Sequence, residues 1–80
     1  MTEPRLLLVT APDCHLCEHA REVLRELQLE AREVNVTGVE AQRLAARGVP
    51  LAFVPVLWDG ERVLGYGRLS ARALKRKHAA

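Results

Sequence analysis

Two cysteines, Cys14 and Cys17, are separated by two residues and are the only cysteines among the 80 residues of the chain. Thiol-disulfide exchange needs one thiolate that attacks a sulfur atom and a second thiol that resolves the mixed disulfide, and a Cys-x-x-Cys motif supplies both. A structural disulfide that closes so short a loop would constrain the unfolded chain little. The motif therefore predicts a redox-active dithiol that forms and breaks a disulfide bond.

The position of the motif assigns a role to each cysteine. A helical pattern runs from residue 14 to about residue 28, with Cys14 at its start and Cys17 on its apolar face. The first turn of a helix offers unpaired backbone N–H groups and the positive end of the dipole, and both lower the pKa of a thiol placed there. We expect Cys14 to be the partly exposed catalytic nucleophile and Cys17 to be the resolving thiol.

The neighbours of the two cysteines are candidates for tuning them and for contacting a substrate. A protonated His15 beside the sulfur would stabilise the thiolate, although an exposed histidine without a role fits the position equally well. Leu16 is expected to cover the disulfide with an apolar side chain. Asp13 is expected to cap the helix by accepting backbone N–H groups. His19 is expected to lie on the helix surface.

The remaining pattern predicts seven elements in the order β-α-β-α-β-β-α. The strands are expected at 6–10, 32–37, 53–58 and 62–65, and the helices at 14–28, at 39–47 and after Ser70. A strand-helix-strand start requires a right-handed parallel crossover, and a tight hairpin at Asp59-Gly60 adds an antiparallel pair. We predict one α/β domain over residues 1–80, with the thioredoxin fold: a four-stranded mixed sheet with helices on its faces.

Composition limits the functions to consider. Twelve basic and ten acidic residues give a formal charge of +2, which offers little reason to expect a nucleic-acid partner. The basic run Lys75-Arg76-Lys77-His78 is expected to complement the dipole of the last helix. The apolar run at 6–9 is too short for a signal-peptide core or a membrane span. We expect a cytoplasmic monomer that does not bind membranes.

A family resemblance rests on the opening Pro12-Asp13-Cys14-His15-Leu16-Cys17-Glu18, on the order of elements and on Val54-Pro55 before the third strand. The chain resembles the glutaredoxin-like members of the thioredoxin superfamily, in particular short bacterial glutaredoxin-like domains. The resemblance implies a dithiol-disulfide oxidoreductase of electron transport. It also implies a cis Val54-Pro55 bond against the disulfide, with the Val54 backbone pairing with a peptide or glutathione. The implied substrates are protein disulfides or glutathione mixed disulfides, and the implied electron donor is glutathione or a reductase.

Three positions differ from glutaredoxins that use glutathione. His15-Leu16 stands where Pro-Tyr is usual, Ala11 stands where a lysine is common, and Gly65-Tyr66-Gly67 stands where Gly-Gly and an acidic residue are usual. Gly65 and Tyr66 are still candidates for substrate contact, because glycine allows close backbone approach. The alternative is that Tyr66 covers the core. Phe53 and Trp58 are expected to be core aromatics.

Two other functions are compatible with the motif. A zinc site normally needs four ligands, and the chain has no second Cys-x-x-Cys, so we assign no metal ligands. An iron-sulfur cluster shared between two chains, as in some glutaredoxin relatives, is one alternative to the oxidoreductase. A thioredoxin-fold binding or adaptor module, in which the cysteines serve a docked partner, is the other.

Overall fold

Strand β1 (Leu6–Thr10) forms the centre of the sheet, and all of its residues are buried. The computed structural model describes residues 5–79, and the side chains of residues 5–76. A strand that is covered on both faces requires a continuous apolar run, which the sequence of β1 provides. Leu6 and Leu8 point into one layer of the core, and Leu7 and Val9 point into the other.

The other three strands are arranged around β1. Strand β2 (Ala31–Asn35) pairs with β1 in parallel, β3 (Val56–Trp58) pairs with its other edge in antiparallel, and β4 (Val63–Tyr66) pairs with β3 in antiparallel. The strand order is therefore β2-β1-β3-β4. The predicted four-stranded mixed sheet is confirmed.

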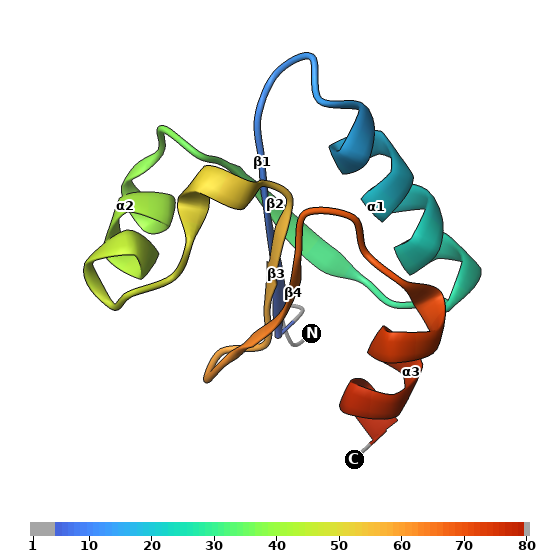
Figure 1. The fold of residues 1–80 in the computed structure, drawn as a ribbon. Coiled ribbons are helices and arrows are strands. Elements are labelled where there is room, and N and C mark those ends of the chain that lie inside the picture. The colour runs from blue at the N-terminus through green and yellow to red at the C-terminus, as the bar shows by residue number, and fades with distance from the viewer. Residues whose placement is uncertain (1–4, 80) are drawn as a thin grey trace.

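Helices cover both faces of this sheet (Figure 1). Helices α1 (His15–Glu26) and α3 (Ala71–Ala79) lie on one face, and α2 (Val39–Ala46) lies on the other. Each face has its own cluster of buried apolar residues, because alternate residues of β1 and β3 point to opposite sides. The predicted order of elements and their two-sided arrangement are confirmed.

Several element boundaries differ from the prediction for identifiable reasons. Helix α1 ends at Glu26, because Gln28 adopts a left-handed conformation with φ of 57°. Strand β2 ends at Asn35, whose Oδ1 accepts hydrogen bonds from the backbone N–H and the hydroxyl of Thr37. The third strand begins only at Val56, because Leu51–Phe53 forms a short 3-10 turn, η1.

The predicted stop of the second helix at Gly48 and the predicted cap of the last helix at Ser70 are confirmed. Gly48, with φ of 93°, follows α2 in the conformation that glycine adopts most readily. Ser70 caps α3, because its Oγ accepts a hydrogen bond of 3.3 Å from the N–H of Ala73. The side chains of Lys77 and His78, two of the four residues in the predicted basic run, lie outside the described part of the chain.

The connection between β3 and β4 is longer than the predicted two-residue turn at Asp59-Gly60. It spans Asp59 to Arg62, and the N–H of Asp59 donates a hydrogen bond of 3.1 Å to the C=O of Arg62. The Asp59 side chain organises it, because Oδ1 accepts the N–H groups of Glu61 and Arg62, both at 2.8 Å. These backbone hydrogen bonds hold the pKa of Asp59 below its usual value.

Replacing this carboxylate should weaken the hairpin. We expect Asp59→Ala to lower the free energy of unfolding at pH 7 by about 1 kcal/mol, the usual net worth of a hydrogen-bonded group. Asp59→Asn retains the Oδ1 acceptor and should lose less. Urea unfolding followed by circular dichroism measures both differences.

The acid dependence of this effect has a definite sign. Because the folded-state pKa of Asp59 is lowered, its charge stabilises the fold above the unfolded-state pKa of about 3.9, and this contribution is lost as the pH falls through the folded-state pKa. The advantage of the wild type over Asp59→Asn should therefore shrink below about pH 4. An advantage that is constant from pH 7 to pH 3 would contradict this role.

Candidate active site

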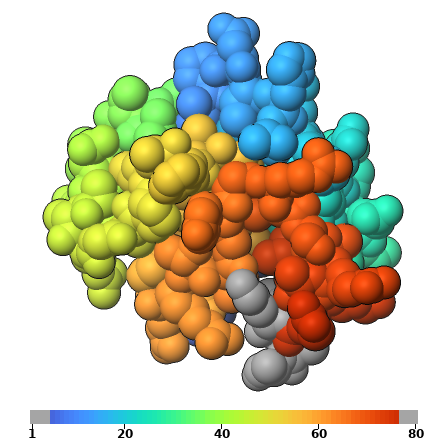
Figure 2. Space-filling view, viewed as in Figure 1, coloured from blue at the N-terminus to red at the C-terminus, as the bar shows by residue number. Residues whose placement is uncertain are grey.

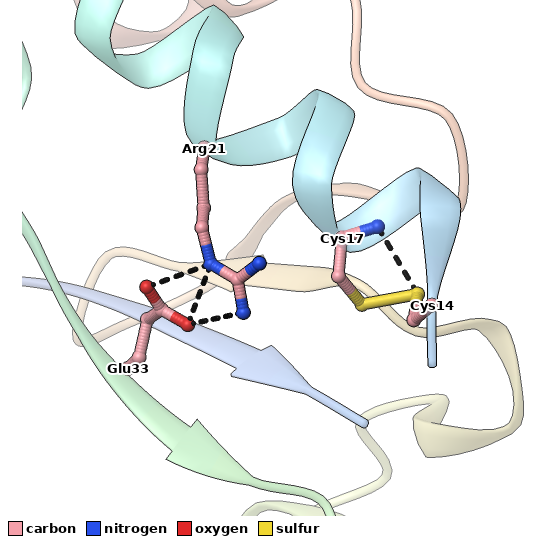
Figure 3. A network of polar contacts seen from close by, with 4 residues as sticks. All are labelled: Cys14, Cys17, Arg21 and Glu33. Atoms are coloured by element: carbon pink, nitrogen blue, oxygen red, sulfur yellow. Dashed lines mark hydrogen bonds and ion pairs between the residues drawn. A yellow bond between two sulfur atoms is a disulfide. The ribbon is translucent and has the colours of Figure 1, made fainter. Parts of the chain in front are cut away.

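Cys14 and Cys17 form a disulfide at the start of α1, with their Cα atoms 5.2 Å apart (Figure 3). Cys14 is the N-cap of the helix, with an extended backbone conformation. Its C=O accepts the N–H groups of Cys17 at 3.1 Å and Glu18 at 3.2 Å. The same N–H of Cys17 lies 3.0 Å from Cys14 Sγ. A backbone donor of the first helical turn is thus directed at the Cys14 sulfur.

The prediction that Asp13 caps this helix is wrong. Asp13 occupies the turn before the helix, in the left-handed region with φ of 53°, and the cap position falls to Cys14. The Cys14 sulfur, and not a carboxylate of Asp13, is the side-chain acceptor at the start of this helix, and it accepts the N–H of Cys17. When the disulfide is reduced, a donor in this position stabilises negative charge on Cys14 Sγ, which favours the thiolate over the thiol.

The two sulfur atoms differ in accessibility. Cys17 is fully buried, whereas Cys14 is only partly buried. The reason is helical geometry: Cys17 lies on the apolar face of α1 that also carries Ala20 and Leu24, and Cys14 precedes that face. A reagent in solution can reach Cys14 first, which is the arrangement expected of a nucleophile followed by a resolving thiol.

The segment around Val54-Pro55 lies at the same end of the sheet. Val9 pairs with Val56, so Pro55 comes next to Thr10, where the chain leaves β1 toward Cys14. The Val54-Pro55 bond is cis, as the family resemblance implied, and Pro55 is buried. Within the described residues, the C=O of Val54 accepts no hydrogen bond. This carbonyl is a potential acceptor for an extended ligand.

A third segment completes this end of the sheet. The N–H of Gly67, just after β4, donates to the C=O groups of Phe53 at 2.8 Å and Pro55 at 2.9 Å. Figure 2 shows the segment at the start of α1, in blue, above the yellow segment that contains η1 and the orange-red segment that follows β4. The structure therefore brings together the cysteines, Val54-Pro55 and the residues after β4.

Three apolar side chains at this end are exposed. Leu16 is 38% exposed, Phe53 is 57% exposed and Tyr66 is 54% exposed. The Phe53 and Tyr66 rings contact each other, with centroids 5.6 Å apart and planes at 45°. Phe53 is therefore not the core aromatic that was expected, because η1 turns it away from the sheet, and Tyr66 does not cover the core. Trp58 is only half-buried.

His15 and His19 occupy different environments. The His15 side chain is fully exposed, and its Nδ1 lies 3.6 Å from Glu18 Oε2. His19 is half-buried, and its Nε2 lies 3.3 Å from the C=O of Leu69, so the expected surface position is wrong. With a proton on Nε2, His19 donates to this carbonyl and links α1 to the segment that precedes α3.

Gly65 is placed within β4, opposite Leu57, and not in the loop beyond it. A Cβ atom at this position would lie 3.0 Å from Cδ2 of Leu69, which is closer than side chains normally approach. The glycine therefore allows the buried Leu69 to pack tightly against the sheet. Substrate contact by Gly65 stays a prediction.

An ion pair fastens the active-site helix to the sheet (Figure 3). Arg21 lies one turn after Cys17, and its Nε donates to both carboxylate oxygens of Glu33 on β2, each at 3.0 Å. The hydrogen bonds to Glu33 raise the pKa of Arg21. Because both side chains are about 40% exposed, the contribution of this pair to stability is modest.

The described residues also bear on metal binding and on membrane spanning. No group of three or more His, Cys, Asp or Glu side chains in residues 5–76 is arranged to hold a metal ion. No helix in the described part of the chain combines the length and the apolar character that crossing a membrane requires.

The mixed sheet, the helices on its two faces and the Cys-x-x-Cys motif at the start of α1 define a protein of the thioredoxin superfamily, consistent with a glutaredoxin-like protein. The family model "Glutathione S-transferase, N-terminal domain" matches residues 8–67, which is three quarters of the chain. The chain therefore belongs to this family, whose domain has the thioredoxin fold. A search of the curated proteins finds no match to the chain.

The difference in burial predicts a difference in reactivity. After reduction and with limiting iodoacetamide at pH 7, we expect alkylation of Cys14 before Cys17, because only Cys14 is accessible. Peptide mass spectrometry measures the two sites separately. In 6 M urea, which removes the burial, the two cysteines should react at similar rates. Preferential alkylation of Cys17 in the folded protein would contradict the assignment.

Proposed function

We propose that this protein is a dithiol-disulfide oxidoreductase that uses Cys14 as nucleophile and Cys17 as resolving thiol. The observation that carries the proposal is the asymmetric cysteine pair at the start of α1. Cys14 is accessible and has a backbone N–H directed at its sulfur, whereas Cys17 is buried one turn further on. Membership of a thioredoxin-fold family supports the same chemistry.

The reaction follows from this arrangement. The Cys14 thiolate attacks one sulfur of a substrate disulfide, forms a mixed disulfide and expels the other substrate sulfur as a thiolate. Cys17 then loses its proton and attacks Cys14 Sγ, which forms the Cys14–Cys17 disulfide and releases the second substrate thiol. Two electrons pass from the protein to the substrate. An external thiol donor, either glutathione or a dithiol reductase, returns two electrons to the Cys14–Cys17 disulfide.

The surroundings of Cys14 suggest how a substrate is held. The unpaired C=O of Val54 can accept a hydrogen bond from an extended peptide backbone, which would place a substrate sulfur near Cys14. Phe53 directly precedes Val54, its ring contacts that of Tyr66 on β4, and the two exposed rings offer an apolar surface. Both protein disulfides and glutathione mixed disulfides have the extended backbone that this arrangement accepts.

Serine substitutions test the two roles separately. We expect Cys14→Ser to abolish disulfide reduction, because a serine hydroxyl does not replace the thiolate, whereas Cys17→Ser should trap a mixed disulfide on Cys14. Insulin reduction with dithiothreitol measures turnover, and intact-mass spectrometry detects the trapped adduct.

The two variants also distinguish the alternatives. Serine is a good N-cap, so Cys14→Ser should retain the circular dichroism spectrum of the wild type. Substantial activity in Cys14→Ser would contradict the nucleophile assignment. A wild-type protein that forms the disulfide but turns over with neither glutathione nor a thioredoxin-reductase system would favour a binding module. An absorbing iron-sulfur chromophore in the purified protein would favour cluster binding.

Substitution of the residue at position 11 tests whether the protein recognises glutathione. Glutaredoxins that use glutathione commonly carry a lysine there, and this chain has Ala11. An added ammonium group that pairs with a glutathione carboxylate at the surface contributes up to about 1 kcal/mol. We therefore expect Ala11→Lys to lower KM for a glutathione mixed disulfide up to about fivefold, and Ala11→Gln to leave it unchanged. Equal KM values for the wild type and both variants would show that position 11 does not control glutathione use.

A further inference from the structure

A cavity lies far from the disulfide, at the opposite end of the sheet. It has a volume of about 290 Å³ and is lined by the start of β1, the end of β3, part of β2 and one side of α2. The register explains its walls: Leu7 pairs with Arg32 on one side and with Trp58 on the other, so these three side chains point to the face covered by α2. The size of the cavity is at the lower end for small-molecule sites.

The cavity is strongly cationic. Among the residues that the structure describes, four arginines line it, namely Arg5, Arg32, Arg43 and Arg47, together with one acidic residue, Glu40. Glu40 is bound by Arg32, and this pairing lowers the pKa of Glu40. The lining residues therefore carry an excess of three positive charges.

Asp59, which is not part of the described lining, interacts with only one of these four arginines, Arg5, as far as the described residues show. Asp59 is close enough to Arg5 for the arginine to contribute to its lowered pKa, but Asp59 also has Arg62 3.7 Å away and two backbone N–H donors. Its charge is thus shared among several donors. The arginines of α2 are left without a dedicated acidic partner beyond Glu40 in the described lining.

The helix dipole explains only part of this arrangement. Arg43 and Arg47 lie near the C-terminus of α2, where positive charge is favourable. Arg5 directly precedes β1, and Arg32 lies on β2 and pairs with Glu40, so the dipole of α2 does not account for their place in the same cavity. Like charges one helical turn apart, as in Arg43 and Arg47, also repel each other. Four arginines from three parts of the chain therefore line one small space.

From this convergence we propose that the arginine cavity is a binding site for the phosphate or pyrophosphate group of a small molecule. A guanidinium group presents paired N–H donors that match two phosphate oxygens, and a pyrophosphate group carries two to three negative charges at neutral pH. The site is independent of Cys14 and Cys17, which lie at the other end of β1.

The single tryptophan of the chain provides a direct readout. Trp58 lines the cavity, and the guanidinium carbon of Arg47 lies 5.7 Å from the centre of its ring. A phosphate group that draws Arg47 away from the ring or changes the local charge should alter the fluorescence of Trp58. No other tryptophan contributes to this signal.

Titration with sodium pyrophosphate at constant ionic strength tests the proposal. We expect a saturable change in Trp58 fluorescence that sodium chloride does not reproduce, and calorimetry should give the same Kd. Arg43→Gln should weaken binding about ten- to a hundred-fold, because charge-assisted hydrogen bonds contribute about 1.5–3 kcal/mol each. Arg43→Gln leaves the contact between Arg47 and Trp58 in place, so Trp58 fluorescence still reports binding to this variant. Arg47→Gln removes that contact, so binding to it is measured by calorimetry.

Matched controls decide the outcome. Arg25→Gln removes an exposed arginine from α1, on the other face of the sheet, and should leave the Kd unchanged. Cys14→Ser should bind pyrophosphate normally, which separates this proposal from the proposed redox activity. Titration with ADP distinguishes two kinds of ligand. Tighter binding of ADP than of pyrophosphate indicates a phosphorylated organic ligand, and tighter binding of pyrophosphate indicates free pyrophosphate. The proposal is overturned by the absence of saturation, by equal binding to Arg43→Gln and the wild type, or by a response to long oligonucleotides alone.

Discussion

The burial of β1 on both faces is the constraint on which the rest of the structure depends. Its two edges are paired with β2 and β3, and its two faces are covered by helices, so its position is fixed in every direction. The chain leaves this strand at Thr10 and reaches Cys14 within four residues. Because β3 is held in register with the same strand, Pro55 and Cys14 are positioned relative to one another through β1. The geometry of the candidate active site is therefore set by the most buried strand.

At the start of α1, one sulfur atom serves two purposes. Cys14 Sγ accepts a hydrogen bond from the N–H of Cys17, which the C=O of Cys14 also accepts, and Cys14 is the more accessible of the two cysteines. The local structure that begins the helix thus supplies the environment that a thiolate needs. Serine, which also caps helices well, can retain the first purpose and lose the second. Helix capping and the proposed redox chemistry at this position are separable for that reason.

Most of the fold could be predicted from the sequence, because periodicity and turn residues act locally. The apolar run of β1, the amphipathic pattern of α1 and the glycine after α2 each correspond to an element that the structure contains. Several boundaries were wrong where a side chain replaced a backbone acceptor or where a proline removed a backbone donor. Asn35 and Asp59 accept backbone N–H groups and lengthen their turns. Strand β3 cannot extend through Pro55 as a regular strand, because proline has no N–H to donate.

The place of the two cysteines at the start of α1 could be predicted, but the surface around them could not, and the arginine cavity could not be predicted at all. The two cysteines are close in sequence, so their proximity could be predicted. The exposure of Phe53 depends on η1, which the alternating pattern of apolar residues did not indicate. The arginines at 5, 32, 43 and 47 converge only because register and helix placement bring three elements together.

The two ends of the sheet consequently differ in character. At the disulfide end, apolar side chains are exposed near Cys14 and Cys17, while at the far end arginines line a small cavity. Repulsion among those arginines is tolerated because the stability of the domain comes from the two apolar layers around β1 and not from its surface charges. The fold can therefore carry a charged cavity at one end without altering the position of the cysteines at the other.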